Sequence, residues 1–112
     1  MPVMVQKKNI QTDTEGYLVD PIDWDEEVAE VLARQENLTL TDEHWAVIKF
    51  MREYYDEHQI AADARFVIRF LADTRGKGSE ARAALFKLFP YGYVKQACKI
   101  AGMRRPRAWS TG

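Results

Sequence analysis

The side chain best suited to reactive chemistry in this chain is its single cysteine, Cys98. It lies in a predicted helix over residues 91–101, which Gly102 ends at a position suited to a left-handed cap. At about 100° per residue, Cys98 falls at the margin of the apolar face, beside Lys95. Nearby ammonium groups, here Lys95 and Lys99, lower a thiol pKa, whereas the negative end of the helix dipole opposes this. A packing role for Cys98 is favoured, and a reactive thiolate stays open.

Other residue types that perform chemistry give weaker signals. The sequence cannot place His44 or His58 near Cys98, and His44 in the first turn of a helix suggests a structural role. The carboxylates of residues 23–27 are typical of a solvated helix start. Gly76-Lys77-Gly78 lacks the length and the Ser/Thr of a phosphate-binding loop. One cysteine and two separated histidines match no metal-ligand spacing, so we expect no metal and no cofactor.

Length and composition indicate one compact domain. The chain has 112 residues, of which 46% are hydrophobic, and no apolar run approaches the roughly 20 residues of a membrane span. The start lacks the layout of a signal peptide, so a cytoplasmic protein is expected. Residues 1–57 hold 5 Lys/Arg and 14 Asp/Glu, net −9, whereas residues 58–112 hold 11 and 3, net +8. This asymmetry either steers a partner or is neutralised within the fold.

The periodicity predicts a mostly α (α+β) fold with five helices. Residues 1–20 are expected to form a β-hairpin with its turn at residues 13–16. Asp23 and Glu26 suggest a capping box for a first helix through Gln35, and Thr41 should cap a central helix ending near His58. Further helices are predicted over residues 61–73, 79–88 and 91–101, with a flexible basic loop at 74–78. The helix over residues 61–73 should bury Phe66, Val67, Phe70 and Leu71 and expose Arg65 and Arg69. Residues 1–102 then form the domain, and residues 103–112 form a flexible C-terminal arm.

Several short stretches, ordered and spaced in a specific way, carry a family resemblance. They are Asp13-Thr14-Glu15-Gly16-Tyr17-Leu18, Leu40-Thr41 with Glu43-His44-Trp45, Arg52-Glu53-Tyr54-Tyr55, Leu88-Phe89-Pro90-Tyr91-Gly92, and Lys95-Gln96-Ala97-Cys98 with Ala101-Gly102 and Pro106. Together they resemble the DsrC/TusE family, which includes the gamma subunit of dissimilatory sulfite reductase and the TusE sulfur-relay proteins. The resemblance implies a helical domain with an N-terminal hairpin, a helix-turn-helix-like element and a sulfur-carrying C-terminal arm.

The chain departs from the family pattern where the chemistry would be. Family members that handle sulfur use a penultimate cysteine, and the DsrC type adds a second cysteine eleven residues earlier. Cys98 matches the earlier one, and Trp109 stands eleven residues further on, followed by Ser110-Thr111-Gly112. The missing cysteine receives a persulfide in relay members and joins the second cysteine in bridging sulfur in sulfite-reductase partners. A further departure is Asp63, near where many relatives have proline.

Three functions remain open. In the first, the protein docks to or regulates a sulfur-relay or sulfite-reductase partner, without independent enzymatic activity. Its docking residues would be Trp109, Arg104, Arg105, Arg107, Lys95 and Lys99. Trp109 is the expected anchor, although it could instead fold back onto the domain.

In the second function, Cys98 alone carries persulfide, which makes the protein a sulfurtransferase. In the third, the protein is a DNA-binding regulator that uses the helix-turn-helix-like region with Arg65, Arg69, Arg75 and Lys77. The acidic first half of the chain counts against nucleic acid as a partner.

Overall fold

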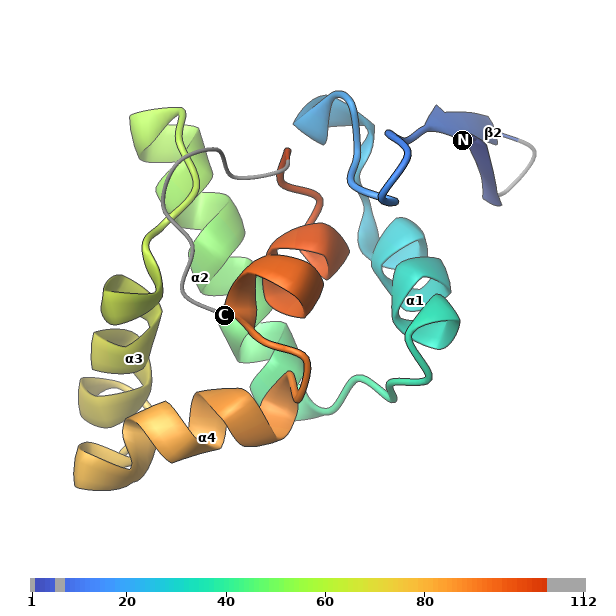
Figure 1. Ribbon diagram of the computed structural model, residues 1–112. Coiled ribbons are helices and arrows are strands. Elements are labelled where there is room, and N and C mark those ends of the chain that lie inside the picture. Colours follow the sequence, from blue (N-terminus) through green and yellow to red (C-terminus); the bar gives the residue numbers. More distant parts are fainter. Residues whose placement is uncertain (1, 6–7, 105–112) are drawn as a thin grey trace.

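The computed structural model of the chain describes residues 2–5 and 8–104. Two strands are followed by α-helices, short 3-10 turns and a final π-helix (Figure 1). In chain order the elements are β1 (Pro2–Val5), β2 (Lys8–Gln11), η1 (Pro21–Asp23), α1 (Glu26–Gln35), α2 (Asp42–His58), α3 (Ala64–Asp73), η2 (Gly78–Glu80), α4 (Ala81–Leu88) and η3 (Tyr93–Cys98). Counting the π-helix, the described residues form the five helices that were predicted, together with a two-stranded hairpin at the N-terminus.

The hairpin forms from other residues than expected. β1 pairs antiparallel with β2, with Pro2 opposite Gln11, so the two strands are joined before the predicted turn. The turn at residues 13–16 does form, because the Asp13 carboxylate accepts the backbone N–H of Glu15 at 2.8 Å and Gly16 has φ 93°. It leads only to a single bridge, between Thr12 and Leu18. The prediction that this turn joins the two strands was wrong.

Helix starts are set by local capping groups. Asp25 caps α1 by accepting the backbone N–H of Val28 at 3.0 Å, so the capping box predicted at Asp23 was wrong. Asp23 instead belongs to η1. α2 begins after Thr41, as predicted, and the Thr41 backbone N–H donates to Nδ1 of His44 at 3.0 Å. α2 ends at His58, also as predicted.

The third helix is shorter than expected and exposes more aromatic surface. α3 begins at Ala64, because Asp63 caps it by accepting the Arg65 backbone N–H at 2.9 Å. Val67 and Leu71 are buried, as predicted. Phe66, however, is 37% exposed and Phe70 only partly buried, which corrects the expectation that both lie in the core.

The loop after α3 is attached to α2. Glu43 contacts the guanidinium of Arg75 at 2.6 Å and the ammonium of Lys77 at 3.3 Å. The loop predicted to be flexible is therefore held at both of its basic residues. It leads through η2 into α4, which meets α3 at a steep angle in the helix-turn-helix-like arrangement implied by the resemblance (Figure 1).

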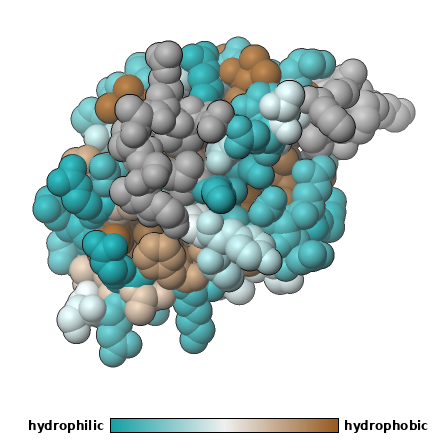
Figure 2. Space-filling view, in the orientation of Figure 1, coloured by the Kyte–Doolittle hydropathy of each residue, from teal (hydrophilic) through white to brown (hydrophobic). Residues whose placement is uncertain are grey.

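The core gathers around α2. Val47, Ile48 and Met51 of this helix are fully buried, which confirms its predicted central position. In Figure 1, α2 lies between α1 and α3, α4 crosses one end, and the C-terminal helical segment lies beside α2. Hydrophilic residues cover much of the face in Figure 2, with hydrophobic residues in separate patches. No helix within residues 2–5 and 8–104 is long and apolar enough to cross a bilayer.

Candidate functional site

The cysteine lies in a helical segment of unusual geometry. Residues Tyr93–Cys98 form a π-helix, preceded by Gly92 at φ 104°. A π-helix closes its hydrogen bonds over five residues instead of four, so it turns less per residue than the roughly 100° of an α-helix. Cys98 is thereby rotated toward Tyr93 and away from Lys95. The expected position of Cys98 at the margin of the apolar face was wrong for this reason.

The Cys98 thiol is sealed inside the core. The residue has no exposed surface, and burial raises the pKa of the thiol to about 12, although a hydrogen bond with Tyr93 lowers it somewhat. The Tyr93 hydroxyl in turn donates to the backbone carbonyl of Ala62. At neutral pH the side chain is therefore a protonated thiol with no exposed surface, which is typical of an inert cysteine.

The two lysines of the segment lie outside the core. Lys95 is exposed, and the Lys99 ammonium lies 3.5 Å from the Glu36 carboxylate and 5.3 Å from the centre of the Tyr17 ring. Gln96 lies between the two lysines in the sequence. Its side chain is buried, and its amide nitrogen donates to the Glu36 carboxylate at 3.3 Å. Glu36 thus connects the end of α1 to the C-terminal segment, and Lys99 is engaged in that connection.

A seam of three residues holds the base of the C-terminal arm. Trp24 Nε1 donates to the carbonyl of Ile100 at 2.9 Å, and Arg52 donates to the carbonyls of Ala101 and Pro21, both at 3.1 Å. The Arg52 guanidinium lies 4.6 Å from the centre of the Trp24 ring. Gly102, at φ 80°, packs so closely that an added Cβ would lie 2.4 Å from this indole. We call Trp24, Arg52 and Gly102 the arm-base seam.

The arm-base seam was not anticipated from the sequence as a unit. Gly102 was expected only as a helix stop, which its positive φ confirms. The sequence predicts Trp24 on the apolar face of the first helix, whereas Trp24 precedes α1, and it gives Arg52 no role beyond the family motif. The three members of the seam are far apart in the chain. The only signal in the sequence is their residue types, since a guanidinium packs favourably on an indole and a glycine allows close approach.

Only the first part of the predicted arm can be placed. Met103 is buried and Arg104 Nε donates to the carbonyl of Val19 at 3.2 Å. The other predicted arm residues for docking, Arg105, Arg107 and Trp109, lie outside the described residues.

The basic residues considered for nucleic-acid binding do not form one surface of free charges. Arg65 contacts its neighbour Asp63 at 3.3 Å, and Arg75 and Lys77 both contact Glu43. Arg69 is exposed on α3. The arrangement gives the DNA-binding alternative no support.

The histidine of α2 has a structural environment. His44 is 5% exposed, and its Nε2 lies 2.7 Å from the carbonyl of Leu88, which fits donation by Nε2–H. Its Nδ1 accepts from Thr41, and its ring packs edge-on against Phe89 at 5.1 Å. Burial lowers the pKa of His44. Nε2 therefore joins α2 to the end of α4, and Nδ1 caps the start of α2 itself. Within the described part of the chain, no cluster of three or more His, Cys, Asp or Glu side chains is suited to a metal ion.

Comparison with known proteins agrees with this architecture. Residues 4–108 match the family model described as DsrC like protein. A Sulfurtransferase TusE from Photorhabdus laumondii is 40% identical over 104 residues, covering 93% of this chain and 94% of the relative.

Two solved structures share the fold. DsrC of Allochromatium vinosum is 43% identical, with a TM-score of 0.86 over 97% of both chains. The oxidized gamma subunit of the dissimilatory sulfite reductase from Archaeoglobus fulgidus, also DsrC, is 33% identical, with a TM-score of 0.85 over 98% of this chain and 100% of that one. With its helical domain, its N-terminal hairpin and a family match over nearly its whole length, this chain belongs to the DsrC/TusE family of sulfur-relay and sulfite-reductase gamma-subunit-like proteins.

Proposed function

We propose that this protein acts in the cytoplasm by docking to or regulating a sulfur-relay or sulfite-reductase partner, without standard persulfide transfer through its arm. One observation carries the proposal: the only cysteine of the chain, Cys98, has no exposed surface. A thiol must reach its donor as a thiolate to accept sulfur, and burial opposes both access and ionisation. Position 109, eleven residues further on, is a tryptophan.

Docking would use the positive second half of the chain. Lys95 is exposed on η3. Arg104 is attached to Val19 at the start of the arm, and Arg105, Arg107 and Trp109 follow it. Tryptophan and arginine are the residue types that contribute most often to binding hot spots. In this proposal the arm is a recognition element, because the side chain that would accept sulfur has been replaced by an anchor.

Sulfur transfer can be tested directly by mass spectrometry. The folded full-length chain is incubated with glutathione persulfide, and intact mass and peptide maps are recorded. We expect no added sulfur on Cys98. A Trp109→Cys variant serves as the positive control and should gain sulfur at position 109. Sulfur on Cys98 of the unaltered chain would contradict the proposal and establish Cys98 as a persulfide carrier, the second function considered above.

Docking through the arm needs a separate measurement. Proteins that co-purify with the chain are identified, and the experiment is repeated with Trp109→Ala and with Arg69→Gln, an exposed arginine on α3, as the matched control. We expect Trp109→Ala to lose sulfur-handling proteins without a change in unfolding temperature. Normal co-purification together with a lower unfolding temperature would show instead that Trp109 packs against its own domain.

A further inference from the structure

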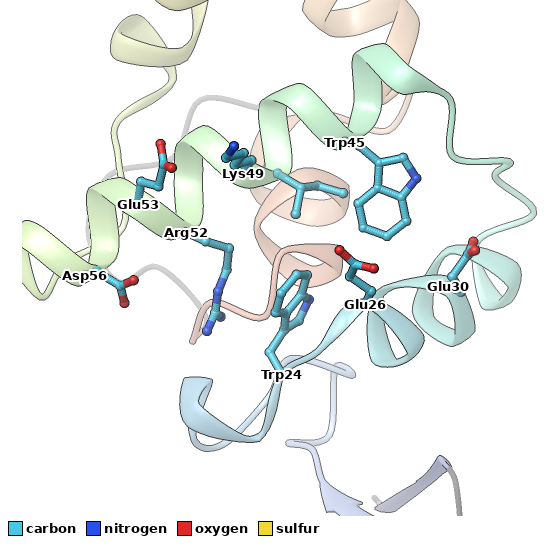
Figure 3. A pocket seen from close by; sticks show the side chains of 9 residues that line it. Trp24, Glu26, Glu30, Trp45, Lys49, Arg52, Glu53 and Asp56 are labelled. Atoms are coloured by element: carbon cyan, nitrogen blue, oxygen red, sulfur yellow. The ribbon is translucent and has the colours of Figure 1, made fainter.

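A cavity with a volume of about 650 Å³ lies between α1 and α2, next to the arm-base seam. Its walls include Trp24, Trp45 and Ile48, and Figure 3 shows both indoles in the space between the two helices. Trp24 and Trp45 are both only partly buried. Cavities of roughly 300–1,000 Å³ with aromatic walls are typical of binding sites.

The rim of this cavity is acidic. Four carboxylates line it, Glu26 and Glu30 from α1 and Glu53 and Asp56 from α2, against two cations, Lys49 and Arg52. All four acidic residues are exposed. We call the cavity with its two indoles and these carboxylates the acidic groove.

One of the two cations in the lining is already engaged. Arg52 donates to two backbone carbonyls and covers the face of Trp24. Its guanidinium also interacts electrostatically with Asp56, but two cations stand against four carboxylates in the lining, so the rim keeps a net negative charge. A ligand for the groove must supply positive charge together with a flat or apolar surface for Trp45.

We propose that the acidic groove binds an arginine-bearing segment of a partner protein. A guanidinium stacks on indole faces and also pairs with carboxylates, so one arginine side chain satisfies both features of the groove. Lysine offers the charge without the planar surface. This surface is opposite in charge to the basic residues of the arm, and the inference does not depend on docking through Trp109.

The position of the groove gives such binding a consequence for the arm. Trp24 and Arg52 line the groove and also hold the carbonyls of Ile100 and Ala101. A segment that packs against Trp24 therefore contacts the residues that fix the base of the arm. Occupancy of the groove should stabilise this seam.

Fluorescence anisotropy with a short labelled peptide tests the proposal. The probe repeats alanine, arginine and leucine, and a matched probe carries glutamine in place of arginine. We compare the full-length chain with a rim variant (Glu26→Gln, Glu30→Gln, Glu53→Gln, Asp56→Asn) and with a control variant of exposed carboxylates elsewhere (Glu57→Gln, Glu80→Gln). Thermal unfolding of each variant verifies that it is folded.

We expect the arginine peptide to bind the unaltered chain, with an affinity that falls as salt is added. The rim variant should lose about tenfold or more in affinity, because several exposed charge pairs are removed together. The control variant should bind within about threefold of the unaltered chain. Trp45→Leu should weaken binding while keeping the rim charges, which isolates the contribution of the indole.

Three results would overturn the proposal. They are absence of binding to the unaltered chain, equal binding of the glutamine peptide, and equal losses in the rim and control variants. A fourth comparison tests whether the groove binds the arm of the same chain instead of a partner. A double variant, Arg105→Gln with Arg107→Gln, could bind the peptide tenfold or more tightly than the unaltered chain. That result would show that the arm competes for the groove and that the proposed partner segment is wrong.

Discussion

Two basic stretches that contain glycine are held in opposite ways in this protein. Residues 99–104 pack against Trp24 and Arg52, so that a Cβ on Gly102 would lie 2.4 Å from an indole atom. In residues 74–78, a Cβ on Gly76 or Gly78 would meet nothing within 4 Å, although both have positive φ. A glycine with positive φ in a basic stretch therefore lies at a tightly packed junction in one place and in an open turn in the other.

The means of attachment differ as well. The C-terminal stretch is held by hydrogen bonds from half-buried Trp24 and Arg52 to backbone carbonyls and by the burial of Met103. The loop is held by ion pairs from Glu43 to Arg75 and Lys77 near the surface, and by the Lys77 backbone N–H, which donates to the carbonyl of Leu71 at 3.0 Å. Exposed ion pairs contribute little and are screened by salt, whereas buried packing contributes more and is not. We expect perturbations of the C-terminal stretch to have the larger effects.

The largest difference should appear in thiol reactivity. Because burial raises the pKa of Cys98 to about 12 from its ordinary 9.0, alkylation by iodoacetamide at pH 8 should be about a thousandfold slower in the folded chain than in the unfolded chain. Moving the cysteine to η2, at the end of the loop, with Cys98→Ser and Ser79→Cys, should restore ordinary reactivity, since residue 79 is exposed. Mass spectrometry over time measures both rates. Rapid alkylation of Cys98 in the folded chain would show that the C-terminal stretch opens readily.

Substitution of the two kinds of glycine should give the next largest effect. Gly102→Ala combines strain at φ 80° with overlap against Trp24, and we expect a loss of about 3 kcal/mol in the free energy of unfolding. Gly76→Ala meets strain at φ 71° without overlap, for a loss of about 1 kcal/mol. Urea denaturation of both variants provides the comparison. Equal losses would mean that backbone strain alone, and not packing against Trp24, distinguishes the two stretches.

Loss of the guanidinium in the seam should have a smaller but clear effect. Arg52→Leu leaves the carbonyls of Pro21 and Ala101 without their donor, so we expect a loss of about 2 kcal/mol in the free energy of unfolding. Arg82→Leu, at an exposed position of α4, is the matched control and should change stability by less than about 0.5 kcal/mol. Chemical denaturation measures both, and similar values would contradict the role of Arg52 in holding the arm base.

The ion pairs of the loop should have the smallest effect. Glu43→Gln removes the contacts to Arg75 and Lys77, with an expected loss of about 0.5 kcal/mol that shrinks at high salt. The hydrogen bond from Arg75 lowers the pKa of Glu43 below its ordinary 4.5. The stabilisation is therefore complete above pH 4.5 and is lost as the pH falls through the lower pKa of the folded state. Thermal unfolding of the unaltered chain and of Glu43→Gln from neutral to acidic pH should show that the difference in stability between them vanishes in acid. A difference that stays constant with pH would refute the stabilising role of the Glu43 ion pairs.

Local signals allowed much of the fold to be predicted from the sequence. The limits of α2, the end of the last helix at Gly102 and the central place of α2 depend on capping, backbone conformation and the density of apolar residues, all of which act over a few neighbouring positions. The order of the family motifs likewise indicated the hairpin and the helical domain. The turn that joins the two strands and the burial of Phe66 were mispredicted, since each depends on what packs against the segment.

The sequence by itself determined that this protein has one cysteine, a tryptophan at position 109 and the motifs of the DsrC/TusE family. Only the tertiary structure decided that Cys98 is sealed, because a π-helix turned it inward and neighbouring elements removed it from solvent. Only the tertiary structure brought Trp24 to Ile100, 76 residues away, and Arg52 to Ala101, 49 residues away. Such contacts depend on how helices pack, and no local pattern in one sequence encodes them.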